Sequence, residues 1–283
     1  MNTNRYFETK QCEPWLYSIK DRMEVFCWLA VGEKAALLYD TGYGIGDLPG
    51  EVRSITDKPL TVVLGHGHAD HAMGAYQFGR ALLHPADMVL VKEHCGPVWR
   101  QKAVDAVSKN KDKLSPYISG FDFDKYMREG TGDIAGLDEV AEFDLGGFTA
   151  RVIPMPGHTP GSTGLYFAKH KVLLAGDAAN RATFMFLPES LPIAGYLEML
   201  RAVAAIDFTN HYTGHQAVAY QKKWFDKYIK VAANALAGKG KPMKIPGFEE
   251  YGEILVSSIG GPILSPAFCA VAYSADKLKA AGD

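Results

Sequence analysis

Cysteine is scarce in this sequence, and its copies never cluster. The four residues are Cys12, Cys27, Cys95 and Cys269, and no two of them have the C-x-x-C spacing of zinc ribbons and redox motifs. Disulfide frameworks and cysteine-based zinc sites need closer spacing. We therefore expect reduced thiols in a cytoplasmic protein.

Long apolar runs and a strong net charge are also lacking. No run of about 18 apolar residues is present, and the first ten residues contain no apolar segment typical of a secretory signal. We therefore expect no membrane partner. The formal net charge is −2, without lysine- or arginine-rich runs, so a nucleic-acid partner is not expected either. A small-molecule substrate is the remaining expectation.

Histidine, in contrast, is concentrated in one run, Gly65-His66-Gly67-His68-Ala69-Asp70-His71. The apolar, β-branched segment 60–64 before it is typical of a buried strand, and the residues from Ala72 to Phe78 read as the opening of a helix. Imidazole and carboxylate are ligands that zinc, iron and manganese accept. A polar surface loop would be the plainer interpretation, but further candidate ligands follow other strands.

These further candidates each stand at or just after the end of an apolar segment. His158 follows the strand predicted at 148–155, Asp177 follows the one at 172–175, and His215 ends the segment 211–215. Asp40 ends the strand at 35–39, where it is either a turn residue or a partner that holds a metal ligand. The isolated His84 and His94 are interpreted as structural.

Together the candidate ligands exceed what one tetrahedral zinc ion needs. The set is His66, His68, Asp70, His71, His158, Asp177 and His215. Five histidines and two carboxylates suit two ions about 3.5–4 Å apart with a bridging carboxylate. Such a pair can hold a hydroxide as nucleophile, and the sequence has neither a Gly-x-Ser-x-Gly elbow nor a phosphate-binding loop.

The motifs resemble those of the metallo-β-lactamase-fold metallohydrolases. The motifs that carry the resemblance are Asp40-Thr41-Gly42, His66-Gly67-His68-Ala69-Asp70-His71, Pro156-Gly157-His158, Gly176-Asp177 and Thr213-Gly214-His215. The resemblance implies an α/β fold, an αβ/βα four-layer sandwich of two mixed sheets with outer helices. It also implies that His66, His68 and His158 hold one metal, that Asp70, His71 and His215 hold the other, and that Asp177 bridges them.

Two residues refine this resemblance. Asp177 is a carboxylate where β-lactamases of this fold usually have cysteine or serine, so the chain is most similar to the glyoxalase II and lactonase-like branch. Gly65 stands where many members of the family have threonine, and the hydroxyl that is lost could have supported His66.

The expected function is a binuclear metal-dependent hydrolase. A metal-bridging hydroxide would attack a small ester-like substrate, a thioester, lactone or phosphodiester, and Asp70 would accept a proton as well as bind metal. Two Zn²⁺ ions are expected, and Mn²⁺ or Fe²⁺ suit the same ligands. The alternative is an oxidoreductase like the mononuclear iron persulfide dioxygenases, for which His66, His68, His158 and Asp177 would suffice.

We predict one domain over residues 1–283, with a helical insertion at about 96–136 and a C-terminal extension at about 238–283. Aromatic residues of the insertion, such as Tyr117 and Tyr126, either line a substrate pocket or anchor the insertion to the core. Residues 216–237 are predicted to be a helix and residues 238–247 a linker. Two apolar stretches follow, 254–259 and 267–273, and the aromatic tail could serve a homodimer.

Overall fold

The computed structural model describes residues 6–279, which divide into two compact units. Unit 1 comprises the described residues up to Val152 together with Gly214–Ala217, and unit 2 comprises Ile153–Thr213 and the described residues from Val218. Residues 1–5 and 280–283 lie outside the residues that the structure describes. The first of these ranges is part of the segment in which we expected no secretory signal. The single domain stays a prediction.

Unit 1 is built on a seven-stranded sheet in which the strands follow the order of the chain. The first four strands pair antiparallel and the last four parallel, so the sheet is mixed. The strands are β1 (Glu8–Glu13), β2 (Leu16–Lys20), β3 (Phe26–Val31), β4 (Ala36–Tyr39), β5 (Leu60–Val63), β6 (Ala81–Leu83) and β7 (Ile134–Gly136). Its central strands are buried apolar runs, as strands covered on both faces require.

The helices of unit 1 fall into two groups, those between the strands of the sheet and those of the inserted segment. The first group is α1 (Leu48–Ile55), α2 (Ala69–Ala72) and α3 (Met88–His94), with short 3₁₀ helices at Met73–Gln77 and Pro85–Asp87. The inserted segment contains α4 (Pro97–Lys109), α5 (Lys111–Ile118) and α6 (Phe123–Arg128). Strand β8 (Glu142–Asp144) then pairs antiparallel with β9 (Thr149–Pro154), which runs into unit 2.

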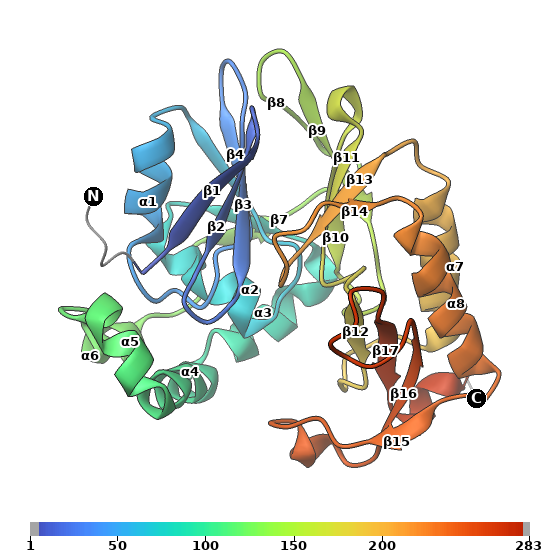
Figure 1. Cartoon of the computed structure of the whole chain (residues 1–283). Coiled ribbons are helices and arrows are strands. Elements are labelled where there is room, and N and C mark those ends of the chain that lie inside the picture. The colour runs from blue at the N-terminus through green and yellow to red at the C-terminus, as the bar shows by residue number, and fades with distance from the viewer. Residues whose placement is uncertain (1–5, 280–283) are drawn as a thin grey trace. The chain divides into compact units, whose positions relative to one another are not determined.

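Unit 2 contributes the neighbouring strands β14-β13-β11-β10 of a second mixed sheet. Strand β11 is antiparallel to β10 and parallel to β13. The strands are β10 (Thr163–Phe167), β11 (Val172–Gly176), β13 (Asn210–Thr213) and β14 (Tyr220–Gln221). Helices α7 (Ile193–Ala204) and α8 (Trp224–Leu236) lie side by side (Figure 1) and bury one apolar face each.

A third, four-stranded sheet is added in unit 2 by the C-terminal segment. Its order is β12-β17-β16-β15, and β12 pairs with β17 in parallel. The strands are β12 (Ala182–Met185), β15 (Lys241–Met243), β16 (Ile254–Ile259) and β17 (Cys269–Tyr273), with 3₁₀ helices at Glu249–Tyr251 and Ala275–Leu278. A last 3₁₀ helix of unit 2, Ala168–His170, joins β10 to β11.

Two local predictions were wrong at their boundaries. The helix expected from Gln216 begins only at Trp224, because Tyr220 and Gln221 pair with β13. The expected linker contains β15, because Lys241–Met243 pairs with β16. Among residues 6–279, no helix has the length and apolar character needed to cross a membrane.

Candidate metal centre

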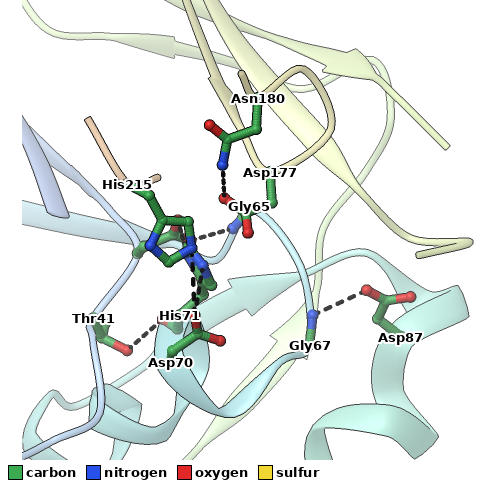
Figure 2. Close-up of polar contacts among 10 residues, drawn as sticks. Thr41, Gly65, Gly67, Asp70, His71, Asp87, Asp177, Asn180 and His215 are labelled. Atoms are coloured by element: carbon green, nitrogen blue, oxygen red, sulfur yellow. Dashed lines mark hydrogen bonds and ion pairs between the residues drawn. The ribbon is translucent and has the colours of Figure 1, made fainter. Parts of the chain in front are cut away.

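The histidine run forms a sharp turn between β5 and α2, and two buried carboxylates hold its backbone. The amide N–H of Gly65 donates to Oδ1 of Asp40 over 2.7 Å. The amide N–H of Gly67 donates to Oδ2 of Asp87 over 2.9 Å (Figure 2). Asp40 and Asp87 are both fully buried. Side chains outside the motif, 20 or more positions away in the chain, therefore hold the shape of the turn.

Both glycines of this turn lie in close contact with their surroundings. A Cβ on Gly67 would lie 3.1 Å from the carbonyl oxygen of Asp87 and from the amide nitrogen of Val91. A Cβ on Gly65 would overlap the hydroxyl group of Tyr39. The space in which a threonine side chain would start is thus filled by Tyr39, and Asp40 supports the turn through the backbone of Gly65.

His71 is held at both its ring and its backbone. Its Nδ1 lies 2.8 Å from Oδ2 of Asp40, and both side chains are fully buried. Its carbonyl oxygen accepts hydrogen bonds from the backbone N–H and from the hydroxyl of Thr41 (Figure 2). Of the two interpretations of Asp40, the structure shows the contact with a candidate ligand. An Nδ1–H donated to a carboxylate leaves Nε2 as the acceptor nitrogen, which is the usual arrangement of a metal-binding imidazole.

Asp70, His71 and His215 bring their ligand atoms together within unit 1. The three atoms lie within 4.8 Å of one another. Oδ2 of Asp70 is 3.3 Å from Nε2 of His71 and 3.5 Å from Nε2 of His215 (Figure 2). Ligands of one tetrahedral zinc ion, each about 2.0–2.1 Å from the metal, are roughly 3.3 Å apart. The donor set and its spacing therefore fit a metal ion.

The other two predicted ligands of unit 1 belong to the same cluster of imidazole rings. The ring centre of His66 lies 4.7 Å from that of His68 and 4.3 Å from that of His71. His68 also stacks on His94 at 5.0 Å, and His94 stacks on Trp99 at 4.1 Å. His94 thus packs against both rings, and His84 pairs with Glu139 over 2.7 Å. The structural interpretation of these two histidines stays a prediction.

The remaining predicted ligands, His158 and Asp177, lie in unit 2. Nδ1 of His158 donates to the carbonyl oxygen of Phe184 over 2.7 Å, which again makes Nε2 the acceptor nitrogen. Asp177 follows β11, and its Oδ1 accepts a hydrogen bond from Nδ2 of Asn180 over 3.3 Å (Figure 2). Each of the two side chains is thus oriented by a partner from its own unit.

Sequence reasoning missed several polar residues that surround these candidates. The sequence pattern did not predict that Asp87 binds the backbone of Gly67 or that Asn180 binds Asp177. Asp21, just after β2, is buried, and burial raises the pKa of its carboxyl group to about 7, with the nearby charge of Asp70 adding to the shift. Its Oδ1 accepts the backbone N–H groups of Met23 and Val25. Asp21 stands just after an apolar strand, as Asp40 does, and this position was the sequence signal that could have identified it.

The inserted segment is anchored to the core of unit 1. Tyr126 is buried, and its hydroxyl donates to the carbonyl oxygen of Tyr43 over 2.9 Å. Arg100 is fully buried and donates to the carbonyl oxygens of Cys95 and Gly130, near the two ends of the segment. The segment also lines two cavities of about 490 and 540 Å³, both bounded by Phe121, although no predicted ligand lines either.

Comparison with known proteins defines the family. The model of the metallo-beta-lactamase superfamily matches residues 21–215, and the chain belongs to this superfamily. A metallo-beta-lactamase family protein of Thermus thermophilus superposes with a TM-score of 0.55 at 20% identity, over 81% of this chain and 82% of that one. The predicted α/β metallo-β-lactamase fold is therefore confirmed.

Individual relatives are about a quarter identical to this chain over part of its length. Acyl-coenzyme A thioesterase MBLAC2 of Homo sapiens is 27% identical over 176 residues, which are 58% of this chain and 61% of that protein. Hydroxyacylglutathione hydrolase GloC of Haemophilus influenzae is 26% identical over 152 residues, 51% of this chain and 61% of that protein. The chain thus spans about three fifths of the length of these relatives.

Proposed function

We propose that this chain is a binuclear metal-dependent hydrolase of a small ester-like substrate. A thioester is the preferred substrate class, and a lactone or a phosphodiester is the alternative. The proposed ligands are those that the family resemblance implies: His66, His68, Asp70, His71, His158, Asp177 and His215. Two Zn²⁺ ions are the proposed cofactors, and Mn²⁺ or Fe²⁺ suit the same donors.

The observation that carries this proposal is the convergence of Asp70, His71 and His215 in unit 1. Two imidazole nitrogens lie 3.3 and 3.5 Å from one carboxylate oxygen, and a buried carboxylate orients one of the two rings. Without a cation, burying this many polar groups would be costly. A structural zinc site would be closed, whereas the side chains of Asp70 and His215 keep 24% and 31% exposure.

Thioesters are preferred among the three substrate classes because of the substrates in the names of the two relatives. One is named for acyl-coenzyme A and the other for hydroxyacylglutathione, which are both thioesters. Asp177 as a carboxylate also favours the glyoxalase II-like branch over β-lactam hydrolysis. At 27% and 26% identity the relatives support the class of bond, and the acyl and thiol parts are left to assay.

The residues of the chain have distinct tasks in this proposal. When bound, the ions supply a hydroxide nucleophile at neutral pH and stabilise the negative charge that develops on the substrate. Asp40 accepts a hydrogen bond from Nδ1–H of His71 and so keeps Nε2 directed at Asp70. Asp70, which is partly exposed, accepts a proton at its carboxylate during turnover.

The first test measures metal content by mass spectrometry on protein purified without a histidine tag, followed by a panel of thioesters, lactones and phosphodiesters. We expect about two ions per chain and turnover of a thioester. His68→Ala and Asp177→Ala should lose both metal and turnover, and His84→Ala, which changes a histidine paired with Glu139, should keep both.

Two outcomes would overturn the proposal. Full metal content and turnover in His68→Ala and Asp177→Ala would remove the ligand assignment. One iron ion per chain, with oxygen uptake in the presence of a thiol persulfide, would replace hydrolysis by the oxidoreductase alternative.

A further inference from the structure

The C-terminal segment lies outside the stretch that the superfamily model matches, yet it is built into the surroundings of His158. The match ends at residue 215, whereas β17 comprises Cys269–Tyr273. Strand β17 pairs in parallel with β12, and this register sets Phe184 opposite Ala272. All of these residues belong to unit 2. An element beyond the family match therefore determines where β12 lies.

Strand β12 supplies the atom that orients His158. The carbonyl oxygen of Phe184 accepts the Nδ1 hydrogen of His158 over 2.7 Å. Since a strand holds its carbonyl groups in place through its sheet, pairing with β17 determines the position of this acceptor. The imidazole is thus oriented by a backbone group that the C-terminal sheet holds in place.

Lys277 makes a second connection to the same histidine. Its side chain is buried, and Nζ donates to the carbonyl oxygens of Pro188 and Ser190 over 2.9 and 2.7 Å. The hydroxyl of Ser190 donates in turn to the carbonyl oxygen of His158 over 2.8 Å. Lys277 therefore reaches the backbone of His158 through one intervening residue.

The next residue of the chain reinforces this connection. The backbone N–H of Leu191 donates to the carbonyl oxygen of Gly157 over 2.8 Å. Ser190 and Leu191 thus bind two successive carbonyl groups of the loop that carries His158, and Lys277 holds the segment from which they come. The loop can shift only if this segment shifts too.

Burial of the Lys277 ammonium group costs free energy unless polar partners compensate for the lost water. The nearest carboxylate that the structure pairs with it is Oδ2 of Asp276, 3.6 Å away on a side chain that is 65% exposed. The two carbonyl oxygens are closer, and hydrogen bonds from a charged donor are stronger than those from a neutral one. The charge of Lys277 thus acts chiefly on the Pro188–Ser190 segment.

We infer that Lys277 is a positioning residue for His158, which holds the Pro188–Ser190 segment so that the imidazole keeps the orientation needed to bind metal. The inference rests on the proposed function, since it takes His158 to be a metal ligand. It assigns to the C-terminal extension a role in metal affinity.

The experiment compares Zn²⁺ affinity in wild type, Lys277→Met and Lys277→Arg by competition with a chromophoric chelator. Lys277→Met should weaken at least one binding step on the order of 10-fold, as loss of a supporting partner does, and Lys277→Arg should restore part of the loss. The visible absorption of Co²⁺-loaded protein should change in Lys277→Met, because the ligand geometry changes. Lys279→Met removes an exposed lysine two positions away and should behave as wild type.

A second variant keeps the test decisive if Lys277→Met does not fold. Ser190→Ala removes only the hydroxyl that donates to His158, and it should weaken Zn²⁺ affinity in the same binding step. Combined in one chain, the two substitutions should weaken affinity by less than the product of their separate effects, because they act along one path.

The outcomes separate this inference from the proposed function. One outcome is that the metal-free variants have lower thermal stability while their Zn²⁺ affinity stays within twofold of that of wild type. Lys277 and Ser190 would then have only a structural role, and the inference alone would be overturned. A wild-type chain that binds no metal would overturn the proposed function and the inference together.

Discussion

Asp40 shows how much one buried carboxylate does at the scale of a residue. Its Oδ1 accepts a hydrogen bond from the backbone N–H of Gly65, and its Oδ2 accepts one from Nδ1–H of His71. It does so from a backbone φ of +67°, a conformation that aspartate adopts more readily than most side chains. One residue therefore fixes both the start of the histidine turn and the ring of a candidate ligand.

Asp40→Asn is predicted to weaken metal binding while keeping the side-chain shape. Asparagine offers one acceptor oxygen, so its amide group would face one of the two donors. We expect Zn²⁺ affinity to fall about 10–100-fold and the free energy of unfolding to fall by about 2 kcal/mol. Chelator competition and urea denaturation measure the two effects.

The matched control for this prediction is Asp57→Asn, which makes the same change at an exposed residue. It should leave both quantities as in wild type. Unchanged Zn²⁺ affinity in Asp40→Asn would contradict the role given to this carboxylate.

At the scale of an element, the short strand β13 contains a buried histidine that is not among the candidate ligands. His211 lies among the rings of Phe208, Tyr220, Phe225 and Tyr228, and its Nε2 is 3.0 Å from the hydroxyl oxygen of Tyr228. Burial lowers the pKa of His211 to about 3. The strand is therefore built around a neutral imidazole.

This strand is predicted to make the fold sensitive to acid. The folded-state pKa of His211 lies below the ordinary value of 6.5, so the unfolded chain takes up the proton first as the pH falls. The stabilisation is fully present above about pH 6.5 and is lost as the pH falls towards about 3, by up to roughly 1.4 kcal/mol per pH unit.

Urea denaturation at pH 7 and pH 5 tests this prediction. Between these values wild type should lose roughly 2 kcal/mol more of its free energy of unfolding than His211→Gln, which does not titrate there. Parallel losses in both proteins would show that other groups cause the acid sensitivity.

At the scale of the whole molecule, the proposed ligands come from positions far apart in the chain, between His66 and His215. An unfolded chain cannot assemble such a set, so we expect metal to bind the folded state and to stabilise it. The homodimer expected from the aromatic tail and the cytoplasmic location stay predictions.

Removal of metal is therefore predicted to lower the melting temperature. Free Zn²⁺ at 100 times its dissociation constant stabilises by about 2.7 kcal/mol, which for a chain of this length is roughly 5 °C. Calorimetry before and after dialysis against a chelator measures the shift. Added Zn²⁺ should restore the original value and Mg²⁺ should not, and equal melting temperatures with and without Zn²⁺ would contradict a tightly held ion.

Local features of the chain were predictable because they depend on neighbouring residues. The apolar segment 60–64, predicted to be a strand, contains β5, and the apolar stretch noted at 254–259 forms β16. The start of α8 and the strand β15 were missed, since both depend on pairing with β13 and β16. Pairing between strands cannot be read from a segment alone.

By itself the sequence determined the kinds of candidate ligand, their order and their places at strand ends, because these follow from local pattern and residue chemistry. Only the tertiary structure decided what holds them: Tyr39 against Gly65, Asp87 beneath Gly67, and Lys277 behind the loop of His158. These partners are 20 or more residues from the groups that they hold. Such contacts exist only once the chain has folded, because burial and close packing, rather than proximity in sequence, bring the atoms together.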